Sequence, residues 1–363
     1  MNSPQTTADL LSVSDLAVEF RTEDGTVYAV DGISFQVRAG ELLAIVGESG
    51  SGKSVTALSL VGLLDRKARV TGSIALDGEE LTGASEQRMQ AVRGGRIGMI
   101  FQDPMTALNP VMTIGAQLAE AIRLHAGKGG RRAIDKAALQ ERCQGLLESV
   151  GVANPAQRLR QYPHEFSGGM RQRAMIAMAI ANDPDLIIAD EPTTALDVTI
   201  QAQVLDQLRK AQRETGAAAI LITHDLGVVA ELADRVIVMY AGRIVETAGV
   251  HELFRQPRHP YTMGLLASLP TLDSELTRLH PIPGSPPDVS QPITSCPFQP
   301  RCPMAVDRCR TEDPGLVEVA DGHLAACFRT DELIGRTPEQ VFVRTVVEAE
   351  EPDEPATAAE ASR

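Results

Sequence analysis

Hydrophobic and polar positions follow two kinds of repeat along the first 250 residues. Period-two alternation over 11–20 and 27–37, with the turn signal Asp24-Gly25 between them, predicts two antiparallel strands. Short apolar runs predict further strands at 42–46, 70–76, 96–101, 186–189, 218–223 and 236–240. Helical spacing predicts helices over 53–64, from 169 to about 182, and over 198–213. Strands and helices that alternate on this scale indicate an α/β fold with a mostly parallel sheet and crossover helices.

The stretch from about 105 to 180 differs, because helical patterns dominate it. Apolar residues recur there on one helical face: Leu139, Cys143, Leu146, Leu147 and Val150. Cys143 is therefore most simply a core residue. We expect residues 105–180 to form an inserted helical subdomain.

Beyond about residue 250 the repeats stop. A stiff Pro/Gly linker occupies 281–287, and four of the five cysteines fall within 296–327. An acidic run, 348–354, follows near the end of the chain and is typical of disorder. We predict a large domain over 8–254, an appended unit over 255–340 and a disordered acidic tail over 341–363.

Composition narrows the class of protein. No run approaches the eighteen or so apolar residues that a membrane span needs, so the chain is not expected to cross a bilayer by itself. The start, MNSPQTTADL, lacks the basic and apolar regions of a secretory signal, and a cytosolic location is the default expectation. The formal charge of −14 disfavours broad binding to a nucleic-acid backbone, so no nucleic-acid partner is expected.

A glycine-rich loop joins the apolar run 42–46 to the helix that follows it. Its sequence, GESGSGKS, fits the pattern G-x-x-x-x-G-K-[ST] and comprises Gly47, Glu48, Ser49, Gly50, Ser51, Gly52, Lys53 and Ser54. Glycines let backbone N–H groups turn towards phosphate oxygens, and the helix N-terminus adds its positive dipole. Lys53 would bridge the β- and γ-phosphates, and Ser54 would offer its hydroxyl to Mg²⁺. The alternative is a glycine-rich turn without a ligand.

Two adjacent carboxylates end the apolar run 186–189 and suit the same chemistry. Asp190 would hold Mg²⁺ through water, and Glu191 would polarise the attacking water as a general base. Solvated turn residues are the alternative interpretation.

Three further segments place polar groups where a ligand could bind. Ser167-Gly168-Gly169 begins a helix, which is a natural anion site. His224 follows a buried strand, at the edge where open α/β sheets bind ligands, and Gln102 ends its strand in the same way. A single His or Gln is usually structural, but the co-occurrence and order of these segments favour a functional interpretation.

Together these motifs resemble the ATP-binding-cassette (ABC) transporter ATPases. The phosphate loop, Gln102, the signature FSGGM over 166–170, LIIADE, Ala195-Leu196-Asp197 and His224 occur in the order of that family, over about residues 11–250. The signature differs from the commoner LSGGQ at Phe166 and Met170, and its Ser-Gly-Gly core is intact. The resemblance implies a P-loop ABC cassette with an antiparallel N-terminal β subdomain and a helical subdomain.

The resemblance also implies roles. Two such domains would pair head to tail around two ATP molecules, so that Ser167, Gly168 and Gly169 contact the γ-phosphate held by the partner chain. Glu191 and His224 would be catalytic, with His224 clamping the γ-phosphate. Gln102 would sense Mg²⁺ and the membrane subunits, and Asp197 would belong to the nucleotide site. Ser54, Gln102 and Asp190 would surround Mg²⁺.

The adenine base would stack on an aromatic residue upstream of the phosphate loop. Phe20 and Tyr28 are the two candidates, and the spacing of the family favours Phe20. Ordinary strand packing is the alternative for either ring.

Four cysteines have the spacing C-x5-C-x6-C-x17-C: Cys296, Cys302, Cys309 and Cys327. In a cytosolic protein this favours metal binding or inert thiols over disulfides. The segment CPFQPRCPMAVDRC, preceded by HPYTMGLLASLP, resembles the C-terminal extension of oligopeptide/dipeptide ABC ATPases, in which these cysteines are associated with a [4Fe-4S] cluster. The resemblance therefore favours a structural iron–sulfur cluster over zinc. His323 is a fallback ligand, and a solvated side chain is its simpler interpretation.

The resemblance finally implies the ATPase subunit of a peptide importer, peripheral at the cytoplasmic face of the cell membrane. Two transmembrane permeases, a second and non-identical ATPase, and indirectly an extracytoplasmic peptide-binding protein would be its partners. Import of nickel, glutathione or another small solute stays open as an alternative. A soluble ABC ATPase of DNA repair or translation is disfavoured by the lack of tandem cassettes, coiled coils or basic surfaces. Glu191 and His224 together disfavour a regulatory module without turnover.

Overall fold

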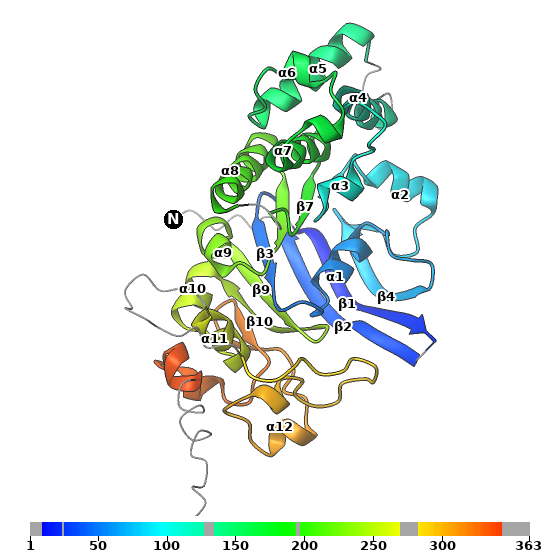
Figure 1. Cartoon of the computed structure of the whole chain (residues 1–363). Helices are drawn as coiled ribbons and strands as arrows, with labels where there is room; N and C mark the ends of the chain where they lie inside the picture. The colour runs from blue at the N-terminus through cyan, green and yellow to red at the C-terminus, as the bar shows by residue number, and fades with distance from the viewer. Residues whose placement is uncertain (1–8, 24, 127–133, 194–196, 269–281, 343–363) are drawn as a thin grey trace, which may run out of the picture.

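The computed structural model describes residues 9–342 except 24, 127–133, 194–196 and 269–281. A central sheet occupies the middle of the molecule, with a helical part above it in Figure 1. An antiparallel sheet from the N-terminal strands lies to one side. The C-terminal part, by which we mean the described residues from 255 onward, lies below. The predicted acidic run at 348–354 and the turn residue Asp24 lie outside the described residues.

The main sheet has eight strands in the order β11-β12-β10-β9-β3-β8-β7-β6. Their bounds are β3 Leu42–Val46, β6 Ile97–Ile100, β7 Leu186–Asp190, β8 Ala218–Ile222, β9 Arg235–Tyr240, β10 Arg243–Gly249, β11 Val317–Ala320 and β12 His323–Ala325. The five strands from β9 to β6 are parallel, and every residue of β3, β7 and β8 is buried. Burial on both faces explains the continuous apolar runs in these strands. The predicted α/β fold with a mostly parallel sheet is confirmed.

A second, four-stranded sheet has the order β2-β1-β4-β5 and is antiparallel. Its strands are β1 Asp9–Thr22, β2 Gly25–Arg38, β4 Ala68–Leu76 and β5 Glu79–Glu80. One face of this sheet packs on α1 and the main sheet through a shared apolar cluster that includes Leu11, Ile74 and Ile45. The alternating pattern at 11–20 and 27–37 has this origin, because only one face is buried.

The helices occupy these bounds: α1 Lys53–Leu60, α2 Glu86–Val92, α3 Pro104–Ala107, α4 Ile114–His125, α5 Lys136–Ser149, α6 Pro155–Arg158, α7 Gly168–Ala179, α8 Val198–Thr215, α9 Leu226–Leu232, α10 Val250–Arg255, α11 Pro260–Ala267 and α12 Arg308–Thr311. Helix α1 ends before the predicted residue 64. Gly62 follows it with φ 60°, and the Leu63 N–H bonds the Leu58 carbonyl, which is a glycine-terminated helix end.

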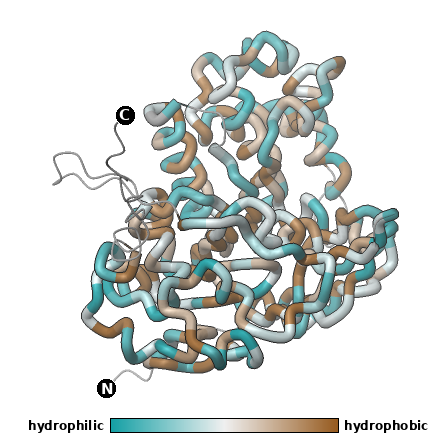
Figure 2. The backbone as a smooth tube through the Cα atoms, turned by 60° about the horizontal axis from the view of Figure 1, so that its bottom comes forward, coloured by the Kyte–Doolittle hydropathy of each residue, from teal (hydrophilic) through white to brown (hydrophobic). Residues whose placement is uncertain are grey.

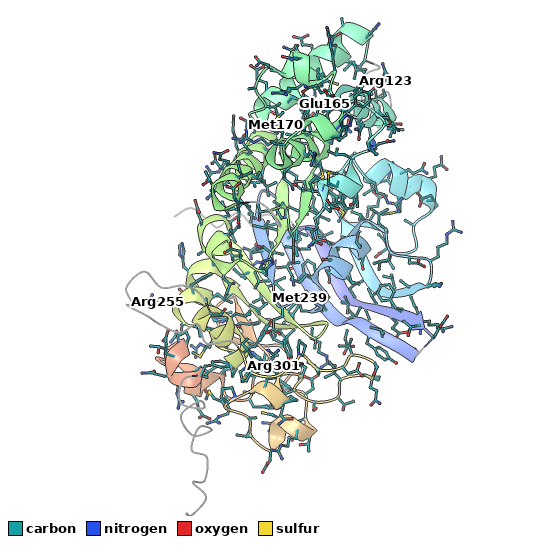
Figure 3. All side chains as sticks on the ribbon, viewed as in Figure 1. Arg123, Glu165, Met170, Met239, Arg255 and Arg301 are labelled. Carbon is teal, nitrogen blue, oxygen red and sulfur yellow. The ribbon has the colours of Figure 1, made fainter. Side chains whose placement is uncertain are left out.

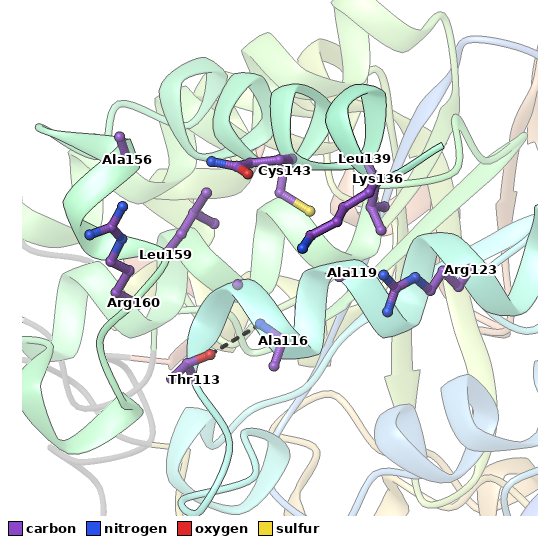
Figure 4. A pocket seen from close by; sticks show the side chains of 12 residues that line it. Thr113, Ala116, Ala119, Arg123, Lys136, Leu139, Cys143, Ala156, Leu159 and Arg160 are labelled. Atoms are coloured by element: carbon purple, nitrogen blue, oxygen red, sulfur yellow. Dashed lines mark hydrogen bonds between the residues drawn. The ribbon is translucent and has the colours of Figure 1, made fainter. Parts of the chain in front are cut away.

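Helices α3 to α7 form the helical part at the top of Figure 1. Cys143 is 3% exposed in its core, as predicted. A hollow of about 470 Å³ lies between α4, α5 and α6, and Figure 4 shows Arg123, Lys136 and Arg160 around its apolar walls.

The C-terminal part continues the main sheet. Strand β12 pairs with β10, placing Ala325 opposite Glu246, and β11 pairs with β12. Val341 and Phe342, assigned from the sequence to a disordered tail, are 4% and 5% exposed. Phe342 packs at the glycine of α11, since a Cβ on Gly264 would lie 2.8 Å from its ring.

Hydrophobic and hydrophilic stretches alternate along the backbone (Figure 2). Within the described residues, no helix combines the length and the apolar character that crossing a membrane requires.

Candidate nucleotide-binding site

The glycine-rich loop turns tightly between β3 and α1. A Cβ on Gly47 would collide with the carbonyl oxygen of Met239 in the neighbouring strand β9. Gly52 has φ 101°, and a Cβ there would lie 2.6 Å from the carbonyl oxygen of Ala29. Only glycine fits these two positions, because each lacks room for a side chain and Gly52 also has a left-handed backbone.

Lys53 lies under this loop and is 5% exposed. Its Nζ donates to the carbonyl oxygens of Gly47 and Glu48, each at 2.8 Å, and lies 3.4 Å from Ser51 Oγ. Burial lowers the pKa of Lys53, and the nearby carboxylates, led by Glu191 and Asp190, oppose that shift. The ammonium group is therefore held at the inside of the loop by backbone oxygens.

Ser54 and Asp190 meet although they are far apart in sequence. Ser54 Oγ donates to Asp190 Oδ1 at 3.0 Å, and Asp190 is 6% exposed. Burial raises the pKa of Asp190, and the Ser54 hydroxyl partly counters this. A hydroxyl beside a carboxylate is an oxygen donor pair that suits Mg²⁺.

Glu191 lies at the junction of three strand ends. Its Oε2 accepts a hydrogen bond of 2.9 Å from Gln102 Nε2, and its Oε1 lies 3.5 Å from His224 Nδ1. Its backbone has φ 44°, a left-handed conformation that non-glycine residues rarely adopt, and its N–H donates to the Ile222 carbonyl at 2.9 Å. The His224 side chain is two-thirds exposed, whereas that of Glu191 is mostly covered. The structure thus brings the three predicted residues together.

A pocket of about 660 Å³ collects most of these groups. Its described lining comprises Phe20, Val27, Ala29, Ser49, Gly50, Gly52, Lys53, Ser54, Val55, Gln102, Glu191, His224 and Val289. Phe20 is among them and Tyr28 is not. The Tyr28 N–H instead donates to the Val289 carbonyl at 2.9 Å. Val289, from the C-terminal part, was missed from the sequence because nothing in its local pattern points to the loop.

The Ser-Gly-Gly segment lies elsewhere, because none of its residues belongs to that described lining. Ser167 caps α7, its Oγ accepting the Met170 N–H at 3.4 Å, and both Ser167 and Gly168 are exposed. Gly169 packs closely on α8, where a Cβ would lie 2.7 Å from Ile200 Cγ2. The departures from the commoner signature are accommodated, since Phe166 is 2% exposed and Met170 packs against the core.

Asp197 caps α8 and accepts the Ile200 N–H at 3.1 Å. Like Ser167, it does not belong to the described pocket lining. Its predicted neighbours Ala195 and Leu196 lie outside the described residues.

Two residues of the C-terminal part contact the phosphate loop and were also missed. Arg301 pairs with the Glu48 carboxylate, and the Tyr261 hydroxyl accepts the Glu48 N–H at 2.8 Å. Both residues lie in segments that resemble the extension of oligopeptide/dipeptide ABC ATPases: Tyr261 is in the HPYT segment, and Arg301 precedes Cys302. Neither segment indicates from its sequence that these residues contact Glu48.

The four cysteines of the C-terminal part lie near one another. Burial raises the pKa values of Cys302 and Cys327 to about 12; the other three cysteines add to the shift at Cys302, and Cys296 and Cys309 add to that at Cys327. All four thiols are free of disulfides. Among the described residues, no three His, Cys, Asp or Glu side chains form a group that could hold a metal ion.

His323 is not solvated, so that expectation was wrong. It is 3% exposed, and its Nε2 lies 2.7 Å from Glu246 Oε1. Strand pairing between β12 and β10 carries the imidazole into the core, where the fully buried Glu246 is its partner.

A buried strand, a glycine-rich loop, a helix-starting Lys-Ser pair and a carboxylate on the neighbouring strand define a P-loop nucleotide-binding cassette. Comparison with known families agrees. The family model described as "ABC transporter" matches residues 30–194, and that described as "Oligopeptide/dipeptide transporter, C-terminal region" matches residues 245–309. The chain belongs to the ABC transporter family, in the group of oligopeptide and dipeptide transport ATP-binding proteins.

Among curated proteins, the chain is 55% identical to the oligopeptide transport ATP-binding protein OppD of Mycobacterium tuberculosis, over 92% of this chain and 54% of that protein. It therefore spans about half the length of this relative. It is 51% identical to the dipeptide transport ATP-binding protein DppD of Bacillus subtilis, with 89% and 95% covered. For OppD of Salmonella typhimurium the identity is 50%, with 90% and 96% covered.

Solved structures show the same cassette. The dimeric ATP-binding cassette MJ0796 in a post-hydrolysis state with ADP and Pi superposes with a TM-score of 0.59 at 26% identity, over 66% of this chain and 98% of that one. CbiO1 from Clostridium perfringens gives a TM-score of 0.57 at 27% identity, over 68% and 91%.

Proposed function

We propose that this chain is the ATP-hydrolysing subunit of a peptide ABC importer. One observation carries the proposal. The Lys53 ammonium, the Ser54–Asp190 pair and the Gln102–Glu191–His224 group all converge on the loop between β3 and α1. A phosphate cradle, an oxygen site for a cation and a carboxylate base in one place are what hydrolysis of a nucleoside triphosphate requires.

The chemistry follows from these contacts. Backbone N–H groups of the loop and Lys53 would hold the β- and γ-phosphates. Ser54, Asp190 and Gln102 would surround Mg²⁺, which neutralises phosphate charge when bound. Glu191 would accept the proton of the attacking water, and the hydrogen bond from Gln102 would hold the Glu191 carboxylate in place. His224, exposed at the mouth of the pocket, would contact the γ-phosphate.

Each site is completed by a second ATPase in this proposal. Ser167 and Gly168 are exposed and lie outside the described pocket lining of their own chain. A head-to-tail pair would bring the Ser-Gly-Gly segment of one chain to the γ-phosphate held by the other. The cassette MJ0796 is dimeric in its solved structure, which supports this arrangement. We propose that the partner ATPase is non-identical, because oligopeptide and dipeptide importers of this type usually pair two different ATPases.

The membrane partners follow from the family. We propose that two transmembrane permeases bind the helical part, at the cytoplasmic face of the membrane, and that an extracytoplasmic binding protein delivers the peptide. The family model over 245–309 and the relatives named for oligopeptide and dipeptide transport favour peptides over nickel or glutathione.

We also propose the domain limits at 8–254 and 255–340, with Asp197 and the adenine-stacking Phe20 as parts of the nucleotide site.

We further propose that Cys296, Cys302, Cys309 and Cys327 hold a structural [4Fe-4S] cluster. The residue type supports this proposal: four thiols lie in one part of the chain, that of Cys309 buried and the other three half-buried, and the Arg329 N–H lies 3.3 Å from Cys327 Sγ, as an N–H donor to a thiolate would. Each of the four cysteines would supply one thiolate ligand, and the bound cluster would cross-link this part of the chain. Burial alone would keep the thiols protonated, and a bound cluster supplies the compensating positive charge.

Hydrolysis is tested with Glu191→Gln, which keeps size and hydrogen-bonding capacity. We expect ATP binding to persist and turnover to fall by about 100-fold or more, because the base is lost. Glu252→Gln on the exposed face of α10 is the matched control, with turnover unchanged. Undiminished turnover in Glu191→Gln would remove the assigned base.

The cluster and the cargo need separate measurements. Protein purified without oxygen should be brown and contain about four irons per chain, and Cys302→Ser should lose them whereas Cys143→Ser should not. Stoichiometric zinc would overturn the cluster.

Purification of the intact complex, followed by uptake of labelled dipeptide, oligopeptide, nickel and glutathione, identifies the permeases and the substrate. Uptake of nickel or glutathione alone would contradict peptide import.

A further inference from the structure

The second residue of the phosphate loop is held by the C-terminal part of the chain. Arg301 Nη1 donates to Glu48 Oε2 at 2.7 Å and Nη2 donates to Glu48 Oε1 at 3.0 Å, which is a two-pronged pair. The Tyr261 hydroxyl accepts the Glu48 N–H at 2.8 Å. The Glu48 carbonyl accepts from Lys53 Nζ. Glu48 is thus fixed through its side chain, its N–H and its carbonyl.

Arg301 is itself rigidly placed. Its side chain is 4% exposed, and its remaining donors reach the carbonyls of Pro283 and Ile282 at 2.9 and 3.2 Å and the Tyr240 hydroxyl at 3.3 Å. Figure 3 labels Arg301 where the C-terminal part meets the sheet. A guanidinium with several fixed acceptors cannot swing away, so it transmits the position of the C-terminal part to the loop.

We propose that Arg301, together with Tyr261, is a positioning residue for the phosphate loop, supplied by the C-terminal extension. The inference rests on the proposed nucleotide function and adds to it a source of loop order from outside the cassette motifs. A loop whose backbone N–H groups already point inward binds phosphate without first being ordered. Neither residue touches the nucleotide in this proposal.

This role predicts a specific kinetic pattern. Loop N–H groups hold the phosphates in both ground and transition states, so loosening the loop raises KM for MgATP and leaves kcat nearly unchanged. A merely structural role gives the opposite pattern, because a smaller folded fraction lowers the apparent kcat at constant KM.

The test uses the full chain, with MgATP binding and steady-state hydrolysis as readouts. Arg301→Ala should raise Kd and KM for MgATP about tenfold or more, because a buried two-pronged charged pair is lost. Arg301→Lys should restore part of the affinity, and Tyr261→Phe should weaken it through the Glu48 N–H. Adding Glu48→Ala to Arg301→Ala should cost nothing further, since both remove the same contact.

The matched control is Arg308→Ala. Arg308 also lies in the extension and directly precedes a cysteine, but it pairs with Glu312 and stacks on Phe328. Its removal should change Kd for MgATP by less than about twofold.

The outcomes separate the two claims. If the unaltered chain binds no MgATP, the proposed function and this inference both fail. If it binds MgATP and folded Arg301→Ala binds equally well, or loses no more affinity than Arg308→Ala, the positioning role alone is overturned. Should Arg301→Ala not fold, Arg301→Lys and Tyr261→Phe decide by the same KM criterion.

Discussion

Replacing Glu246 by alanine tests the joint between the C-terminal part and the central sheet. Glu246 lies on β10 with no exposed surface. Its carboxylate accepts the backbone N–H groups of Arg258 at 2.6 Å and His259 at 3.0 Å, and lies 2.7 Å from His323 Nε2 on β12. One side chain therefore ties the start of α11 and strand β12 to β10.

The cost can be estimated from these contacts. Glu246→Ala leaves two buried backbone N–H groups without their acceptor, at about 1–3 kcal/mol each. The loss of the His323 partner adds to this, so the free energy of unfolding should fall by about 3–6 kcal/mol. Glu246→Gln keeps an acceptor oxygen but turns an amide N–H₂ towards another donor, so its cost should be smaller.

Urea unfolding followed by circular dichroism measures the effect, with all variants prepared at the same metal content. Glu252→Ala, an exposed carboxylate on the adjacent α10, is the control and should change the free energy of unfolding by less than about 0.5 kcal/mol. Hydrogen exchange should rise at the N–H groups of residues 258, 259 and 323–325. A loss below about 1 kcal/mol in Glu246→Ala would refute the reasoning, because buried donors cannot lose their acceptor so cheaply.

Three shorter predictions concern the phosphate loop, the residue that stacks on adenine, and the dependence of stability on pH. Gly52→Ala should abolish MgATP binding in a folded protein, measured by calorimetry, because its Cβ would lie 2.6 Å from a carbonyl oxygen in β2. Phe20→Ala should weaken ATP binding about tenfold because stacking on adenine is lost, and Tyr28→Ala should not. The reverse result would show that adenine stacks on Tyr28 instead. Burial lowers the pKa of His259 to about 3, so between pH 6.5 and 3 the unfolded chain binds one more proton at this residue. His259 therefore contributes a loss of stability of about 1.4 kcal/mol per pH unit as the pH falls through that range. His259→Asn should flatten that slope in pH-dependent urea titrations; an unchanged slope would contradict it.

The phosphate loop and its carboxylates could be predicted because local patterns specify them. A strand, a glycine loop and a helix follow one another in sequence, and parallel strands end at the same edge, so Asp190 and Glu191 had to lie near Lys53. The pairing of Arg301 with Glu48 spans 253 residues and has no periodic signal. His323 was misjudged for a related reason: it directly follows the turn residues Asp321-Gly322, and only the pairing of β12 with β10 buries it.

The C-terminal part also shares the apolar core of the cassette, and this bears on how the chain divides. The Phe298 ring lies 5.4 Å from those of Tyr240, at the end of β9, and Tyr261, in α11, and all three side chains are fully buried. The two matched family models leave 195–244 between them, yet Tyr240 from this interval contacts both other rings. A cut after residue 254 would expose an aromatic face, leave β10 paired with β9 alone and free Glu48 from Arg301. The residues beyond 254 therefore share one core with the cassette and are not expected to fold as a detachable module, so their loss should impair folding and nucleotide binding together.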